Sequence, residues 1–285
     1  MTRADKPKGR SLQLSPSPVK QKLIELNTAI PVYSPEKAST PEFARVLKQH
    51  YPDLFVVVAY GEIIKQILLD VPRWDAINIH ASLLPKYRGA APMQRAIMAG
   101  ETETGITIIE MVLKMDAGPI LEMEKCPITS EMTLGELEEK LYFLACRAIK
   151  KVLHQYEEKQ VKKKSQEESL ATYANKIIPE ELEIDWTRPA FELHNLIRAV
   201  SPKPAAWTRI LVGNQEKRLK IQRTDLENEL SGTPGGILVF GQGRLVVACG
   251  KGALSLLEVQ LEGKKVMPVD EFVKGIHEPL SFLIK

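Results

Sequence analysis

The stretch Ile77–Ile97, INIHASLLPKYRGAAPMQRAI, begins as an apolar strand and then breaks at a Ser-Leu-Leu-Pro segment. Side chains two residues apart on a strand point to the same side, so Asn78 and His80 share one face. In open α/β sheets, ligands bind beyond the carboxyl ends of the strands. We therefore predict that an amide and an imidazole project together where a ligand binds.

Segments that predict strands and helices alternate on both sides of this stretch. The run DLFVVVAYG at 53–61 is apolar throughout, which is typical of a parallel strand covered on both faces. Ser17-Pro18 and Thr40-Pro41 are start signals for helices. Other strands are predicted at 30–35, 75–80, 105–112 and 119–128, and helices at 17–27, 40–51, 62–72, 90–100 and 133–159. This alternation predicts an open, Rossmann-like α/β sheet.

The sequence changes character from about residue 182. One predicted helix at 189–200 precedes five short strand-like runs, at 206–212, 219–223, 235–240, 244–249 and 253–260. Short strands separated by Gly, Pro and charged residues predict a small antiparallel β-barrel, similar to an OB fold. We therefore expect a catalytic domain at 1–156, a polar, lysine-rich linker at 157–181 and a C-terminal barrel at 182–285.

Composition narrows the class of protein. The chain has 285 residues, 44% hydrophobic and 26% charged, with a net charge of +3, which is ordinary for a globular protein of one or two domains. Its three cysteines, Cys126, Cys146 and Cys249, are odd in number and far apart, which favours a reducing compartment over a disulfide framework. No apolar run of about 18 residues is present, so we expect no membrane span.

A carboxylate strengthens the candidate site at Asn78 and His80. Asp116 lies in a Gly-containing turn after the predicted strand at 105–112, again at the carboxyl end of a strand, where it could orient His80. Two simpler readings stay open. Asn-x-His can merely satisfy backbone groups at a strand end, and an Asp before Gly is common in ordinary turns. The spacing of His, Cys, Asp and Glu suggests no metal site.

Several motifs taken together resemble the folate-dependent formyltransferases. They are NIHASLLPKYRGAAPMQRAIMAGETETGITI at 78–108 and DAGPIL at 116–121. Further motifs resemble one branch of that family, the methionyl-tRNA formyltransferases: SPSPVKQ at 15–21, VVVAYGEI at 56–63, CPIT at 126–129, EIDW at 183–186 and GKKVMPVDEFVKG at 263–275. The resemblance runs through nearly the whole chain, and its SLLPKYRGAAPMQRAI block is highly specific.

The resemblance implies a reaction, a formyl donor and site residues. The formyl group of 10-formyltetrahydrofolate would pass to the free amine of methionine on initiator tRNA, for translation initiation, without a metal. Asn78 and His80 would bind and polarise the formyl oxygen, and Asp116 would hold His80 and help to manage the amine proton. The loop Ser82-Leu83-Leu84-Pro85 would lie against the folate.

The resemblance also changes the interpretation of the basic residues near the start of the chain. Taken alone, Lys6, Lys8 and Arg10 are typical of a solvated loop, but in the family a loop of this kind reaches the acceptor end of the tRNA. The basic face of the barrel would hold the tRNA from the other side. We expect a monomer with no membrane contact, in the bacterial cytoplasm, with an organelle left open.

Two departures from the family pattern stand out. The family usually has Asp-Thr-Gly-Asp where this chain has Asp-Ala-Gly-Pro at 116–119. The family also begins with a strand-turn-helix unit of roughly 30 residues, whose strand is central in the sheet. That unit is not recognisable here, so we expect the flanking strands to expose apolar surface and unpaired backbone. We further expect that Met1 is a mis-chosen start or marks a truncation.

Two rival functions share parts of this pattern. A formyltransferase acting on an amino-sugar nucleotide shares the Asn-x-His, SLLP and GETETG motifs, but the barrel and the motifs at 15–20 and 90–96 argue against it. An RNA-binding module with an inactive catalytic half is the alternative from another class. The intact set of Asn78, His80 and Asp116 argues against that alternative.

Overall fold

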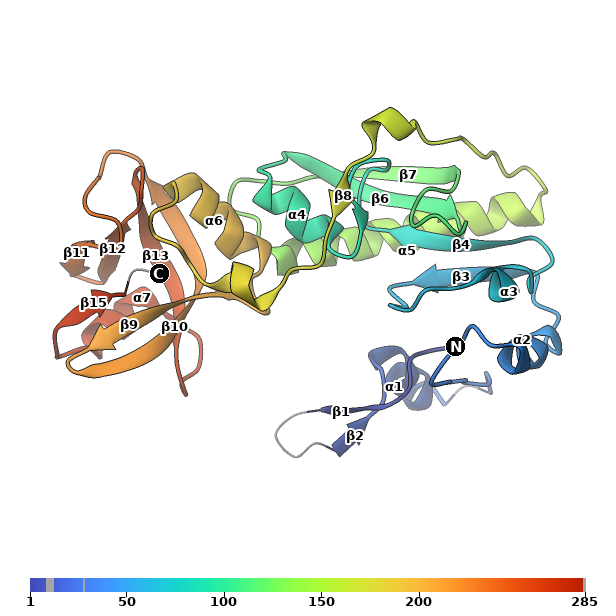
Figure 1. Ribbon diagram of the computed structural model, residues 1–285, viewed down its shortest axis with the longest axis horizontal. Helices are drawn as coiled ribbons and strands as arrows, with labels where there is room; N and C mark the ends of the chain where they lie inside the picture. The colour runs from blue at the N-terminus through green and yellow to red at the C-terminus, as the bar shows by residue number, and fades with distance from the viewer. Residues whose placement is uncertain (9–12, 28, 284–285) are drawn as a thin grey trace.

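The computed structural model describes residues 1–8, 13–27 and 29–283. Its two main hydrophobic cores lie in different halves of the chain. One core lies under the sheet of the N-terminal half, and the other fills the C-terminal barrel. Figure 1 shows the two halves at opposite ends of an elongated molecule. Among the buried residues of the C-terminal core, Ile184 comes first in the sequence.

The N-terminal half is built on a four-stranded sheet in the order β3-β4-β6-β7. Its strands are β3 (Leu54–Val58), β4 (Asp75–His80), β6 (Glu103–Glu110) and β7 (Ile120–Pro127). β3 and β4 are parallel, whereas β6 is antiparallel to both of its neighbours. The long helix α5 (Leu134–Glu157) packs on this sheet through Leu137, Leu141 and Val152. The predicted α/β domain is therefore confirmed, with a mixed sheet.

The helix start signals in the sequence work as predicted. The Ser17 and Thr40 side chains accept hydrogen bonds from the first turns of α1 (Pro18–Glu25) and α2 (Pro41–Lys48). The helix predicted at 62–72 is only the single turn α3 (Gln66–Leu69), and that at 90–100 is α4 (Pro92–Met98). The strand predicted at 30–35 is wrong, because these residues find no partner strand in the described part of the chain.

β3 lies at the edge of the sheet. The prediction that it is covered on both faces is wrong, because Val56 and Val58 are 43% and 58% exposed. Its other face is covered, since Phe55 and Val57 pack on a small cluster around Leu68. The exposed apolar edge agrees with the expectation that a strand in this position presents unpaired backbone.

The C-terminal half is an antiparallel barrel, as predicted. Its strands follow the order β11-β12-β13-β10-β9-β15, and a further short strand, β14, pairs with β13. They are β9 (Ala206–Val212), β10 (Gln215–Glu227), β11 (Ile237–Gly241), β12 (Arg244–Ala248), β13 (Ala253–Leu261), β14 (Met267–Pro268) and β15 (Leu280–Phe282). β14, β15 and the helix α7 (Val269–Lys274) were not predicted, because each is very short.

Helix α6 (Ala190–Ala199) connects the two halves through buried polar side chains. Arg198 donates from one guanidinium nitrogen to the carbonyls of Thr129 and Met132, both at 3.1 Å. His194 contacts the Ser130 carbonyl at 3.1 Å with one ring nitrogen and the Thr224 hydroxyl at 2.9 Å with the other. These bonds fix the barrel against the loop that precedes α5, because each donor would otherwise be buried without a partner.

A salt bridge beside α6 closes the same joint between the halves. Arg223 of β10 donates to Glu136 of α5 at 2.6 Å, and both line a cavity of about 260 Å³. Burial alone would raise the pKa of Glu136, but hydrogen bonds from Thr133 and Arg223 outweigh it and lower that pKa to about 2. The charged form of Glu136 is therefore the one that stabilises the folded protein.

The stabilisation that the salt bridge between Arg223 and Glu136 gives to the contact between the two halves should be lost in acid. The stabilisation is complete above the usual carboxyl pKa of about 4.5 and disappears as the pH falls toward 2. We expect Glu136→Gln, which can still cap α5, to cost about 0.2–1 kcal/mol of unfolding free energy at neutral pH, because the pair is partly exposed. Urea unfolding at a series of pH values should show the difference from wild type shrinking below about pH 4.5.

Glu139→Gln, at an exposed position of the same helix, is the matched control for this comparison. A difference between wild type and Glu136→Gln that stays constant down to pH 3 would contradict the assignment.

Candidate active site

The candidate site lies at the carboxyl end of β4. His80 is the last residue of that strand and is buried, and it pairs with Thr107 of β6 across the sheet. Asn78 is half-buried two residues earlier, and its side chain makes no hydrogen bond within residues 1–8, 13–27 and 29–283. The strand thus places one fixed imidazole and one free amide on the same face.

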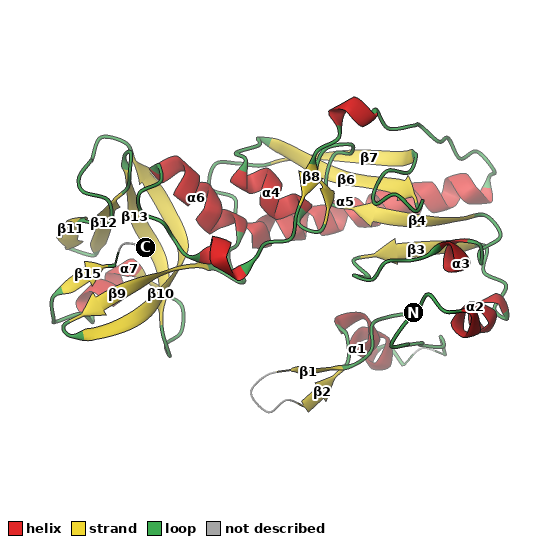
Figure 2. Cartoon of the chain, in the orientation of Figure 1, coloured by secondary structure: helices red, strands yellow, loops and turns green. Residues whose placement is uncertain are grey.

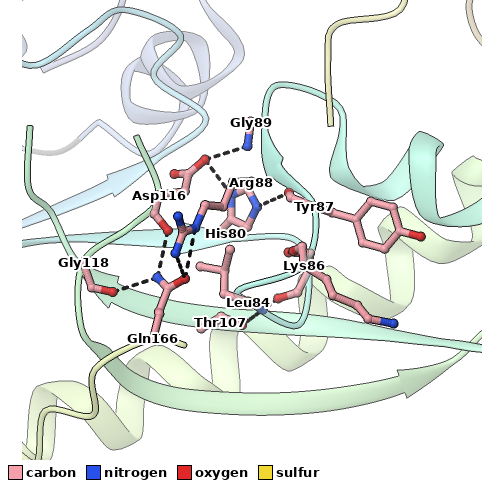
Figure 3. Close-up of polar contacts among 11 residues, drawn as sticks. His80, Leu84, Lys86, Tyr87, Arg88, Gly89, Thr107, Asp116, Gly118 and Gln166 are labelled. Atoms are coloured by element: carbon pink, nitrogen blue, oxygen red, sulfur yellow. Dashed lines mark hydrogen bonds and ion pairs between the residues drawn. The ribbon is translucent and has the colours of Figure 1, made fainter. Parts of the chain in front are cut away.

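The His80 ring lies between a main-chain carbonyl and a carboxylate. Its Nε2 atom lies 2.9 Å from the Tyr87 carbonyl, and its Nδ1 atom lies 3.6 Å from a carboxylate oxygen of Asp116. A carbonyl can only accept a hydrogen bond, so Nε2 carries a proton in this arrangement. Figure 3 shows the ring between these two residues. Nδ1 is consequently the ring nitrogen left for chemistry.

Asp116 lies in the turn between β6 and β7, with a positive φ of 51°. Asp is among the few residues that tolerate this left-handed conformation. Its Oδ2 atom accepts a hydrogen bond of 2.8 Å from the Gly89 backbone N–H, and its side chain is only 13% exposed. His80 and Asp116 are therefore brought together, although 36 residues separate them in the sequence, and Asn78 lies on the same strand face as His80.

The buried hydroxyl of Thr107 holds the loop Ser82-Leu83-Leu84-Pro85 through two hydrogen bonds to its backbone. Thr107 donates to the Ser82 carbonyl at 2.6 Å and accepts from the Leu84 N–H at 3.1 Å. The Leu84–Pro85 peptide bond is cis. Ser82 and Leu84 are buried, whereas Leu83 and Pro85 stay partly exposed. Only the latter two side chains can present apolar surface to a ligand.

The basic residues near the start of the chain lie on or beyond a hairpin. β1 (Lys6–Lys8) pairs with β2 (Gln13–Ser15), and Lys6 is exposed on it. Lys8 ends β1, and Arg10 lies outside the described residues. Within the described chain, no hydrogen bond or ion pair joins Lys6 to the residues around His80.

Sequence reasoning missed four residues of the site: Thr107, Tyr87, Arg88 and Gln166. Tyr87 adopts a positive φ of 61°, which directs its carbonyl toward His80, and its phenol donates to Glu101 at 2.8 Å. Burial and the Glu101 carboxylate raise the pKa of that phenol, which stays protonated as a donor. The contact between the Tyr87 carbonyl and His80 is made by the main chain, which every residue type has, so the sequence does not indicate it.

The described residues contain neither a group of side chains that could hold a metal ion nor a helix that could cross a membrane. In residues 1–8, 13–27 and 29–283, no three His, Cys, Asp or Glu side chains are grouped so as to hold a metal ion. No helix in the same ranges is long and apolar enough to cross a membrane.

Comparison with known families covers both halves of the chain. The family model described as "Formyl transferase" matches residues 1–153, and the model described as "Formyl transferase, C-terminal domain" matches residues 176–277. The fold and the site therefore define a formyltransferase.

Curated relatives make the assignment more specific. The chain is 49% identical to a methionyl-tRNA formyltransferase from Protochlamydia amoebophila, over 100% of this chain and 89% of that protein. It is 44% identical to a protein of the same name from Pseudomonas syringae, over 98% of this chain and 87% of that protein. The chain belongs to the methionyl-tRNA formyltransferase family and is a formyl-transfer enzyme.

Solved structures support the fold. HypX from Aquifex aeolicus in complex with tetrahydrofolic acid is 21% identical, with a TM-score of 0.63, over 85% of this chain and 43% of that longer chain. An N-formyltransferase from Helicobacter canadensis, in complex with folinic acid and dTDP-3-aminofucose, is 22% identical with a TM-score of 0.60. The match covers 74% of this chain and 76% of that chain. At this level of identity the likeness concerns the arrangement of the chain.

The Thr107 hydroxyl should be essential for the Ser82–Pro85 loop. Thr107→Val has nearly the same shape but leaves the buried Leu84 N–H without an acceptor, which costs about 1–3 kcal/mol. We expect chemical denaturation to show this loss and folate affinity, by equilibrium titration, to fall with it. Thr107→Ser, which keeps the hydroxyl, should retain most of both. Equal behaviour of the two variants would show that the hydroxyl does not hold the loop.

Proposed function

We propose that this chain transfers the formyl group of 10-formyltetrahydrofolate to the α-amine of methionine on initiator tRNA, with Asn78, His80 and Asp116 as catalytic residues. The observation that carries the proposal is the placement of His80. Its ring is held between the Tyr87 carbonyl and the Asp116 carboxylate, with the free amide of Asn78 on the same strand face.

The reaction needs no nucleophile from the protein. An α-amine has a pKa near 7.7–8.0, so a useful fraction is neutral at pH 7 and can attack the formyl carbon itself. A bond forms from the amine nitrogen to that carbon, and the bond from the carbon to the folate nitrogen breaks. The protein must stabilise negative charge on the formyl oxygen, and the proton lost by the amine must pass to the folate nitrogen that leaves.

Each catalytic side chain has a separate task in this proposal. The Asn78 amide donates to the formyl oxygen, for which one such donor contributes about 2.7–4 kcal/mol in acyl transfer. His80 acts through Nδ1, because Nε2 already donates to Tyr87. A proton on Nδ1 provides the second donor to the oxygen, and the Asp116 carboxylate at 3.6 Å stabilises that charged ring and takes part in removing the amine proton.

The Ser82–Pro85 loop fits a flat apolar ligand. Ser82 and Leu84 are buried and fix the backbone, whereas Leu83 and Pro85 remain partly exposed beside the catalytic strand. We propose that Leu83 and Pro85 contact the folate directly and that Ser82 and Leu84 hold the loop in shape. The tetrahydrofolic acid and folinic acid named with the two solved structures are consistent with a folate donor.

We propose that the tRNA meets this protein at both ends. Lys6 and Lys8 lie on β1 of a hairpin in the N-terminal half (Figure 1), where cations can reach phosphates, and Arg10, which follows in the sequence, lies outside the described residues. The barrel, matched by the C-terminal family model, would hold the opposite side of the tRNA. We further propose a monomer in the bacterial cytoplasm, since the relatives compared are bacterial.

The test is formyl transfer from 10-formyltetrahydrofolate to methionine-charged initiator tRNA, followed at single turnover. We expect wild type to transfer the group and His80→Ala to be slower by roughly a hundred- to ten-thousand-fold, because a positioned acid–base group contributes this much. His154→Ala, exposed on α5, is the matched control and should keep the wild-type rate.

An amino-sugar nucleotide offered as the acceptor separates the main rival function. Transfer to the sugar amine but not to the charged tRNA would overturn the proposal. Binding of tRNA without folate binding would instead indicate an inactive RNA-binding module.

A further inference from the structure

The segment between the two halves, residues 162–174, lies across the catalytic half and is called here the crossing segment (Figures 1 and 2). Lys164 exchanges two backbone hydrogen bonds with Ile120, at 2.7 and 2.9 Å. Further along, β8 (Tyr173–Ala174) pairs in parallel with β5 (Arg88–Gly89). The segment is therefore part of the structure of the catalytic half at both of its ends.

One side chain of the crossing segment reaches the Asp116 turn. The Gln166 amide nitrogen donates to the carbonyl oxygens of Asp116 and Gly118, both at 2.8 Å (Figure 3). This turn needs such support, because Asp116 has a positive φ and a left-handed residue is retained only where its surroundings hold it. The turn is also tightly packed against β6 at Gly118, since a Cβ at this position would lie 1.8 Å from the Glu110 carbonyl oxygen.

The orientation of the Gln166 amide is itself fixed by a buried charge. The Arg88 side chain is 0% exposed and donates to the Gln166 amide oxygen through Nε at 3.2 Å and a terminal nitrogen at 2.9 Å. Its other terminal nitrogen bonds Glu168 at 2.9 Å. A buried guanidinium requires acceptors, so the amide oxygen of Gln166 faces Arg88 and its NH₂ group faces the turn.

The carboxylate of Asp116 depends on the same segment by a second route. Its Oδ2 atom accepts from Gly89 N–H at 2.8 Å, and Gly89 belongs to β5. On either side of Gly89, the Arg88 N–H donates to the Thr172 carbonyl and the Ala90 N–H to the Ala174 carbonyl, both at 2.9 Å. The backbone and the side chain of Asp116 are thus both positioned from the crossing segment.

We propose that Gln166 is a positioning residue for the transfer reaction, acting through Asp116, with Arg88 setting the direction of its amide. This inference rests on the proposed function. Gln166 itself touches no reacting atom: it holds the turn that places the Asp116 carboxylate beside His80 Nδ1. Displacement of a catalytic group by about 1 Å can cost a hundredfold in rate.

Three variants test the proposal by steady-state kinetics, which separate kcat from KM. Gln166→Ala removes the amide, and Gln166→Glu keeps an acceptor for Arg88 but removes the donor to the turn. Glu167→Ala is the matched control, since Glu167 is exposed and its hydrogen bond stays within the segment, to Ser169. We expect kcat to fall about tenfold to a hundredfold in both Gln166 variants, with the KM for folate and tRNA within about twofold, and Glu167→Ala to match wild type.

A double variant separates positioning from general stability. Asn tolerates the left-handed conformation, so Asp116→Asn keeps the turn while removing the catalytic carboxylate. We expect Gln166→Ala to lower the rate by less than about twofold in the Asp116→Asn background, because the group it positions is already gone. A merely structural role would lower the rate by the same factor in both backgrounds.

The outcomes are distinguishable. A wild-type chain that transfers no formyl group would overturn the proposed function itself. An active wild type with Gln166→Ala equal to Glu167→Ala, or with an undiminished effect in the Asp116→Asn background, would overturn the inference about Gln166. Far-UV circular dichroism checks that each variant folds. If Gln166→Ala unfolds, Gln166→Glu replaces it, both in the comparison with Glu167→Ala and in the Asp116→Asn background.

Discussion

The site depends on how the His80 ring is held. The Tyr87 carbonyl bonds Nε2, the Asp116 carboxylate lies 3.6 Å from Nδ1, and Asn78 lies two residues earlier on the same strand face. Both of these groups come from residues in sparsely populated backbone conformations, since Tyr87 and Asp116 each have a positive φ. Such conformations cost free energy and persist only where surrounding contacts hold them, so the loops around β4 are as important as the strand itself.

The supporting contacts come from a part of the chain that carries no catalytic group. The crossing segment pairs with β5, accepts from the Arg88 backbone and bonds the Asp116 turn through Gln166. It then continues to α6, whose buried Arg198 fixes the barrel to the loop before α5. The connection between the two halves therefore organises the active site as well as the joint, and this links the catalytic site to the half proposed to hold tRNA.

The shared face of Asn78 and His80 could be predicted from sequence because strand geometry is local. Both residues lie on β4 with the period of two, whereas β6 is antiparallel to β4 and ends opposite Ile77. The position of Asp116 near His80 therefore depends on the turn after β6 and not on a shared edge of the sheet. Gln166 could not be predicted, since it lies 50 residues from Asp116 in a polar stretch typical of a linker. The open edge at β3 shows another limit: an apolar run predicts a strand, but the neighbour that covers it is decided by topology.

The proposed role of His80 requires that Nε2 stays bonded to the Tyr87 carbonyl, so that Nδ1 is the ring nitrogen that acts in the reaction. The most direct measurement is the ¹⁵N spectrum of the histidine rings in the free protein, with the His80 signals assigned from their loss in His80→Ala. We expect a proton on Nε2, hydrogen-bonded to the Tyr87 carbonyl. A ring with its proton on Nδ1 and a bare Nε2 would contradict it.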